Sequence, residues 1–145
     1  MGTATTTANS ILLLVLNATT WANVAINATS SPITIVAAAL HTADPGAGGT
    51  QQTNEVAYTS YARVSTNRNS SSGGWTVTTN SASPATVSIS FPAGTGGSGT
   101  ATYWSTGPTA SGATAIFWSG TVTPNIVCGN GVTPQLTTAS TITIT

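Results

Sequence analysis

The sequence contains very little charge. Only 3% of its 145 residues are charged, there is no lysine, and the formal net charge at pH 7 is zero. Charged residues make up roughly a quarter of an average soluble domain. Two arginines cannot neutralise a run of phosphates, which is the interaction that supplies most nucleic-acid affinity. We therefore expect neither nucleic acid nor an anionic membrane surface as a partner.

Cysteine is almost as scarce. Cys128 is the single cysteine, so the chain can form neither an internal disulfide nor a cysteine-based zinc site. We interpret it as a small buried apolar side chain. The most apolar stretch, Ile11–Leu16, is too short to span a bilayer, and no basic residue precedes it. Neither a signal peptide nor a membrane anchor is therefore expected.

The sequence does contain enough apolar residues for a folded core. Hydrophobic residues make up 39% of the chain and the mean hydropathy is +0.20, which is unlike the composition of a disordered protein. A chain of this length buries about two thirds of its unfolded surface. Because a free chain near zero net charge tends to associate, we expect a subunit that assembles with other proteins.

Residues 1–32 are predicted to form an N-terminal helix or extended arm. Residues 8–16 fit a short helix with Asn9 or Ser10 as its N-cap, whereas residues 19–31 fit either a strand or a loop. Pro32 marks a boundary. We expect residues 33–145 to form a β-sandwich domain, with the whole chain folding as one unit.

From residue 33 onward the sequence has β character. Thr141–Thr145 and Thr86–Phe91 alternate strictly between aliphatic and hydroxyl side chains, whereas Ile33–Leu40 is a continuous apolar run typical of a strand buried on both faces. Gly, Pro, Asn and Ser clusters separate the segments. The pattern predicts a mainly β fold, an antiparallel β-sandwich or jelly-roll-like barrel. The other expected strands are residues 56–64, 75–79, 100–106 and 113–123.

The acidic, basic and histidine side chains all lie between residues 41 and 68. They are His41, Asp44, Glu55, Arg63 and Arg68. No nucleophile-elbow motif accompanies His41 and Asp44, and no group of these residues has metal-ligand spacing. We therefore expect no enzyme activity, no catalytic residue, no metal site and no cofactor.

The same region instead predicts a structural clasp made of His41, Asp44, Glu55 and Arg63. Asp44, Pro45 and Gly46 form a turn signal, because Asp accepts backbone N–H bonds, Pro fixes φ and Gly adopts positive φ. If the strand that carries Arg63 pairs with the strand that begins at Ile33, Arg63 reaches Asp44 or Glu55. Such an ion pair would hold residues 42–55.

Several segments, in order along most of the chain, resemble a family of small bacteriophage virion proteins that are often labelled tail fibre proteins. The most specific is the segment from Leu40 to Gly46 followed by Tyr61-Ala62-Arg63. The remaining segments are Ile89–Pro92, Ser119–Thr123, Gly131–Pro134 and Thr141–Ile144. The resemblance implies a structural protein of the virion.

Within that class, the first hypothesis is a capsid decoration, or cement, protein on the outer surface of the capsid. It would bind the major capsid protein and stabilise the head, as a homo-oligomer for which a trimer is the natural guess. The small size favours it, because a fibre usually needs a shaft repeat or a coiled coil. The candidate interface anchors are Trp21, Trp75, Trp104 and Trp118.

Two alternatives remain. The chain could be a tail-fibre or adhesin module that binds host surface glycan through exposed aromatic rings, hydroxyls and amides. An ice-binding surface of Thr-x-Thr ladders ranks last, because its regular repeat is missing from the sequence. Location in the virion separates the first two hypotheses.

Overall fold

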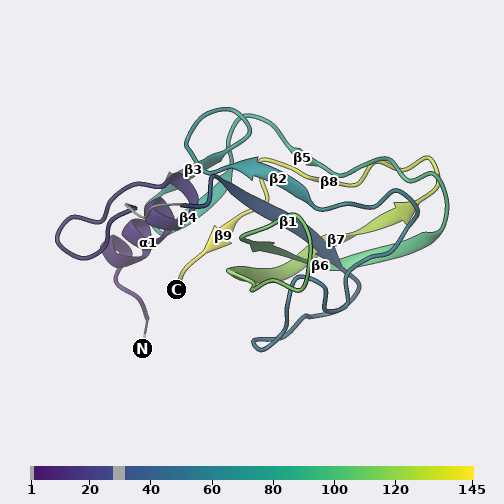
Figure 1. Cartoon of the computed structure of the whole chain (residues 1–145), viewed down its shortest axis with the longest axis horizontal. Helices are drawn as coiled ribbons and strands as arrows, with labels where there is room; N and C mark the ends of the chain where they lie inside the picture. Colours follow the sequence, from purple (N-terminus) through teal and green to yellow (C-terminus); the bar gives the residue numbers. More distant parts are fainter. Residues whose placement is uncertain (1, 28–31) are drawn as a thin grey trace. The chain divides into compact units, whose positions relative to one another are not determined.

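The computed structural model describes residues 2–27 and 32–145 of the chain. The protein is mainly β, with antiparallel sheets and one helix, α1 (Thr5–Asn17), near the N-terminus (Figure 1). No sheet in the described residues closes into a barrel. The predicted mainly β, antiparallel class with a short N-terminal helix is therefore confirmed, with open sheets.

The chain divides into two compact units. Unit 1 comprises Met1–Ile35, Thr66–Ser88 and Thr137–Thr145, and unit 2 comprises Val36–Ser65 and Ile89–Leu136. The chain therefore passes from one unit to the other four times. The expected division into residues 1–32 and 33–145 stays a prediction about folding.

Unit 1 combines α1 with a three-stranded antiparallel sheet in the order β3 (Trp75–Thr78), β4 (Ser81–Pro84) and β9 (Ile142–Thr143). The helix packs against β3 and β4 (Figure 1). Its buried face consists of Ala8, Leu12 and Leu16, spaced four residues apart, as expected for one side of a helix. This apolar stripe and Trp75, which is fully buried, belong to the core of the unit.

The helix begins earlier than the sequence indicated. It starts at Thr5, and Ala4 is its N-cap with no side-chain bond, so the prediction that Asn9 or Ser10 caps it is wrong. Both residues lie inside the helix because the threonines before them continue the helical turn. Ala18 (φ 54°) ends the helix, and Thr19 N–H donates to the Leu13 carbonyl at 3.0 Å. No helix in residues 2–27 or 32–145 has the length and apolarity to cross a membrane.

Unit 2 contains most of a four-stranded sheet in the order β2, β1, β6 and β7, apart from the first residue of β1 and the last two of β2. Strand β1 is central, and its residues from Val36 to His41 are all buried, which confirms the predicted buried strand. Strands β5 and β8 form a second, two-stranded sheet. The bounds are β1 (Ile35–His41), β2 (Val64–Asn67), β5 (Ile89–Ser90), β6 (Ser98–Gly107), β7 (Trp118–Gly129) and β8 (Gln135–Leu136).

Strand β7 is an edge of the four-stranded sheet and carries an irregularity. It pairs with β6, and the register jumps from Ala101 opposite Ile126 to Tyr103 opposite Thr121. Four residues of β7, 122–125, therefore face a single residue of β6. Pro124, which has no N–H group to donate, lies in this bulge.

Candidate functional site

The predicted clasp lies in unit 2, around the loop that follows β1. Arg63 and Glu55 form an ion pair, with Nε to Oε1 at 2.7 Å and Nη2 to Oε2 at 2.9 Å. The side chains are 3% and 17% exposed, respectively. This is a two-pronged, largely buried pair, a geometry that fixes the orientation of both groups. Of the two carboxylates that the sequence offers, the structure pairs Arg63 with Glu55.

Further hydrogen bonds surround this pair. Tyr61 Oη donates to Glu55 Oε1 at 2.9 Å and accepts from Leu40 N–H at 3.0 Å. Arg63 Nη1 donates to the Gly112 carbonyl at 2.9 Å. Burial raises the pKa of Tyr61, and the nearby Glu55 carboxylate adds to that effect. The phenol therefore keeps its proton and its bond to the carboxylate.

His41 occupies the last position of β1 and is completely buried. Its Nδ1 lies 2.8 Å from the Thr53 carbonyl, so Nδ1 carries the hydrogen, and Nε2 lies 2.7 Å from Ser105 Oγ on β6. Burial lowers the pKa of His41, since desolvation opposes the charged form more than its backbone partner favours it. The neutral ring thus links the loop to the sheet.

Asp44 takes a different place from the other three clasp residues. It is exposed, and its Oδ1 accepts the Gly46 N–H at 2.8 Å, while Gly46 has φ 73°. The predicted turn chemistry is confirmed. Asp44 does not pair with Arg63 in this structure, because its carboxylate closes its own turn.

Gln51 is a buried polar residue of this loop that sequence reasoning missed. Its Nε2 donates to the Ala37 carbonyl at 3.0 Å, and its Oε1 accepts from Thr114 Oγ1 at 3.1 Å. A side chain at Gly107 would collide with it, because a Cβ there would lie 2.3 Å from Oε1. No motif identifies such a residue, since its burial depends on strands distant in sequence.

Arg68 in unit 1 is the second residue that the predicted clasp left out. Its Nε donates to the Val15 carbonyl at 2.6 Å, and Nη2 donates to the Leu14 carbonyl. Nη1 bonds Asn27 Oδ1 at 2.5 Å. A cation at the C-terminal end of a helix satisfies free carbonyls and opposes the helix dipole favourably. Arg68 therefore holds the end of α1 without a carboxylate partner.

The four tryptophans differ in exposure. Trp75 is fully buried, with Nε1 donating to Thr66 Oγ1 at 2.9 Å, and Trp104 is 6% exposed. Trp21 and Trp118 are partly exposed. The anchor role stays a prediction, and Trp21 and Trp118 are the pair that can reach a partner without rearrangement. Cys128 is buried, as expected, and burial raises the pKa of its thiol.

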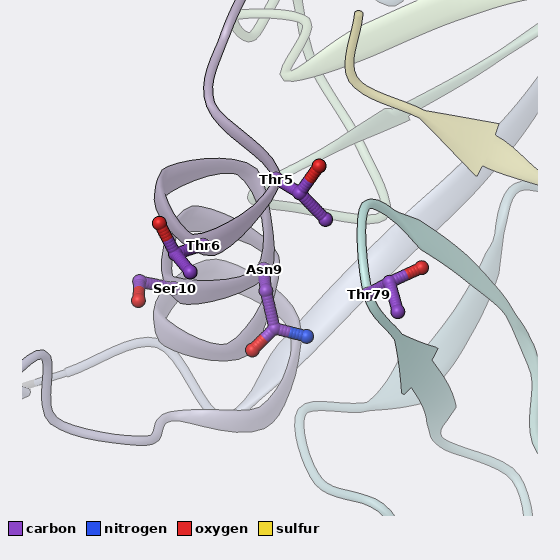
Figure 2. A pocket seen from close by; sticks show the side chains of 5 residues that line it. All are labelled: Thr5, Thr6, Asn9, Ser10 and Thr79. Carbon is purple, nitrogen blue, oxygen red and sulfur yellow. The ribbon is translucent and has the colours of Figure 1, made fainter.

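Each unit has a hollow lined largely by polar residues, although much of the lining surface is formed by their carbon atoms. In unit 1, Figure 2 shows Asn9 of α1 reaching toward the turn that carries Thr79, in a hollow of roughly 390 Å³ that also involves Thr5, Thr6 and Ser10. In unit 2, a hollow of roughly 290 Å³ lies beside the ion pair. Its lining includes Gln52, Glu55, Tyr61, Arg63 and Ser111. In the described residues no three His, Cys, Asp or Glu side chains are grouped to hold a metal ion.

Comparison with known proteins gives one family. A family model described as Podophage GP4 fiber I protein gp80 matches residues 2–144, which is nearly the whole chain. A comparison with curated proteins finds no match.

Proposed function

The chain belongs to the Gp80 family of podophage fibre proteins, a class of virion structural proteins, and we propose that it is a fibre subunit that acts by packing against other virion proteins. Its role is structural and not catalytic. The contacts that hold it in the particle are neutral hydrogen bonds and apolar contacts. A homo-oligomer, as the sequence suggested, is part of this proposal.

The proposal rests on one observation: nearly all acidic, basic and histidine side chains are engaged in ion pairs and hydrogen bonds within the protein. His41 and Arg63 are buried, Glu55 is bonded to Arg63 and Tyr61, and the Arg68 guanidinium binds backbone carbonyls. Asp44 is the one exposed member of the five acidic, basic and histidine side chains, all of which lie in described residues. A surface with so little charge contacts its neighbours without ion pairs.

The closest approach to a catalytic arrangement also favours a structural role. Ser105 Oγ lies 2.7 Å from His41 Nε2, but both residues are completely buried. The other ring nitrogen faces a carbonyl, whereas a catalytic triad places a carboxylate there. A substrate has no access to this hydroxyl.

Location in the virion tests the proposal directly. A small epitope tag at the C-terminus and gold-labelled antibody, viewed by electron microscopy, should mark appendages of the tail. Attachment should also persist in about 1 M salt, where the Debye length is about 3 Å. Gold on the head, or release of the protein by salt alone, would contradict a neutral fibre contact.

A second candidate is the capsid decoration protein, bound to the major capsid protein on the outer capsid surface. The absence of a shaft favours it, because the longest helix in the described residues has 13 residues and the longest strand has 12. A trimer would fit local three-fold positions. If this candidate is right, gold will cover the head, and particles that lack the protein will release their DNA at a lower temperature.

Binding of host surface glycan is the alternative within the fibre class. The hollow in Figure 2 offers hydroxyl and amide groups without charge, which suits a neutral sugar. Its lining contains no aromatic ring on which a sugar could stack. Binding of the purified protein to host cells, lost on Asn9→Ala, would favour this alternative.

A further inference from the structure

The turn after β7 contains the one Asn-Gly pair of the sequence, Asn130–Gly131. It joins the end of β7 to the segment that leads to β8, within unit 2 (Figure 1). Asn130 is exposed. Asparagine is among the chemically labile residues, and glycine has no Cβ to shield its backbone nitrogen from the side chain before it. This pair is therefore the place where the chain is most open to deamidation.

Deamidation needs no enzyme and no cofactor. The backbone nitrogen of Gly131 attacks Cγ of Asn130 and forms an N–Cγ bond, while the Cγ–Nδ2 bond breaks. The former amide group leaves as ammonia and takes the proton of the Gly131 N–H. Water then opens the resulting cyclic imide and leaves either aspartate or isoaspartate at residue 130. The reaction adds a negative charge to a chain whose formal net charge is zero.

The structure holds the attacking nitrogen away from this reaction. Gly131 N–H donates to the Gly94 carbonyl at 2.8 Å, and Gly94 N–H donates to the Val132 carbonyl at 2.9 Å. Val132 N–H also donates to the Gly129 carbonyl at 3.1 Å, which closes a tight turn in which Gly131 adopts a φ of 74°. To reach Cγ, the Gly131 nitrogen must turn toward the Asn130 side chain and so give up its bond to Gly94.

Gly94 makes this contact possible because its backbone lies directly against the turn. A Cβ at Gly94 would lie 2.0 Å from the Gly129 carbonyl oxygen, which is too close for any side chain. Gly94 and Asn130 also form an isolated parallel bridge. We use the name Gly94 contact for Gly94 together with residues 129–132. All of these residues belong to unit 2, so the contact is internal to that unit.

We propose that Asn130 is a deamidation site whose reaction is controlled by opening of the Gly94 contact. Because only the open turn lets the nitrogen attack, the rate in the folded protein is the rate in the unfolded chain multiplied by the fraction of time that the contact is open. Two hydrogen bonds between Gly94 and the turn break on opening, which slows the reaction by about thirtyfold. The chemical state of residue 130 thus records how often unit 2 has opened at this turn, whatever the place of the protein in the virion.

The experiment follows residue 130 in the purified full-length protein at neutral pH. Aspartate and isoaspartate are measured over time by peptide mass spectrometry, in native buffer and in guanidinium chloride. Asn69, which precedes a serine, is the internal comparison in each sample. We expect Asn130 to react faster than Asn69 in denaturant, and about thirtyfold more slowly in native buffer than in denaturant. Equal rates at Asn130 in the two buffers overturn the proposal, as does a faster reaction at Asn69 in denaturant.

Two glycine variants test the contact itself. Gly94→Ala places a methyl group against the turn, whereas Gly99→Ala, in β6 of the same unit, places one where no other part of the chain lies within 4 Å. We expect Gly94→Ala to speed deamidation in native buffer by about tenfold, and Gly99→Ala to leave the rate unchanged. Thermal unfolding shows whether each variant is folded. A folded Gly94→Ala protein with the wild-type rate, or an equal increase in both variants, contradicts the proposal.

Hydrogen exchange of the wild-type protein keeps the test decisive if Gly94→Ala does not fold. Exchange of the Gly131 amide hydrogen requires the same bond to Gly94 to open. Its protection, measured by NMR, should therefore match the slowing of deamidation in native buffer within about threefold. A strongly protected Gly131 amide combined with an unslowed reaction at Asn130 overturns the proposal, and so does an unprotected amide.

Discussion

The two units use their arginines in opposite ways. In unit 2, Arg63 meets a carboxylate, Glu55, and the pair is largely buried. In unit 1, Arg68 meets no carboxylate and instead binds the carbonyls of Leu14 and Val15. Both guanidiniums join segments that are far apart in sequence.

This difference shows how a chain with few charges distributes them. A buried ion pair gives little net stability, but loss of one partner leaves an uncompensated charge. A guanidinium on carbonyls leaves only neutral groups behind when it is removed. We therefore expect loss of Arg63 to lower the free energy of unfolding more than loss of Arg68 does. Each substitution should mainly destabilise the unit that contains it.

The largest loss of stability should come from replacing Trp75, the buried tryptophan of unit 1. Trp75→Ala removes a fully buried ring and its bond to Thr66, and we expect a loss of about 4 kcal/mol in the free energy of unfolding. Chemical denaturation measures it. Trp118→Ala, at a partly exposed site, should cost about 1 kcal/mol. Equal losses would mean that the burial contrast between them is wrong.

Arg63→Ala should cost about 3 kcal/mol, because it leaves the Glu55 carboxylate buried with Tyr61 as its remaining partner. Residues 42–55 should become sensitive to protease. Arg63→Gln/Glu55→Gln, which removes both charges, should recover part of the loss. If protease cleavage in this loop does not change with Arg63→Ala, the ion pair does not hold it.

Arg68→Ala should cost about 2 kcal/mol, the value of charge-assisted bonds to backbone carbonyls. Hydrogen exchange should increase at the C-terminal turn of α1 and stay unchanged in β1 and β6. Arg68→Lys should recover part of the loss through a single bond. A loss of protection in β6 would show that the two units do not respond separately.

The smallest effect is a pH dependence confined to unit 2. The pKa of His41 is lowered from its ordinary value of 6.5 by burial, with Glu55, Arg63 and Asp44 as the charged groups around it. Below about pH 6.5 the unfolded chain binds a proton that the folded chain does not, so stability should fall as the pH falls. Denaturation at pH 7 and pH 5 measures this. His41→Gln should reduce the difference between the two pH values, and an unchanged difference would assign it to other groups.

Local sequence patterns predicted the elements in which one face or both faces are apolar. Ile33–Leu40 became β1, displaced by one or two residues, and the segment from Trp75 became β3. The same patterns failed at β4, which has the sequence Ser-Ala-Ser-Pro and no strand signal. It is a strand because β3 and β9 pair with it on either side. Such tertiary pairing overrides local propensity.

Residues 56–64 show the opposite failure. They were expected to form a strand, but only Val64 belongs to one. Residues 56–63 make a single isolated bridge, between Thr59 and Gly96, and Ser60 adopts a positive φ of 81°. Their apolar members serve another purpose, because Tyr58 packs edge-on against Tyr61 and Tyr61 stacks on Phe91. Aromatic side chains that pack a loop give the same enrichment in aromatic and β-branched residues as a strand. The sequence pattern alone cannot separate these two uses.

The sequence predicted the charged residues of the candidate site but not its neutral ones. Because the acidic and basic residues are few, the sequence could place Arg63 near Asp44 or Glu55, and the structure selects Glu55. The neutral members of the site, Gln51 and Ser105, could not be identified, because nothing distinguishes them from the many other polar residues of the chain. Arg68 was missed because its partners are backbone carbonyls and the amide of Asn27, and no sequence motif identifies such partners.

The bulge of β7 limits how readily this sheet edge can pair with the strands of other chains. The chain is nearly neutral, so it has no charge repulsion to keep its copies apart. A long unprotected sheet edge would then recruit the strands of other copies into aggregates. Pro124 has no backbone N–H donor, and the register breaks at residues 122–125. Together these features divide the β7 edge into two shorter segments. An irregular edge of this kind pairs less readily with the strands of another chain than a long regular edge does.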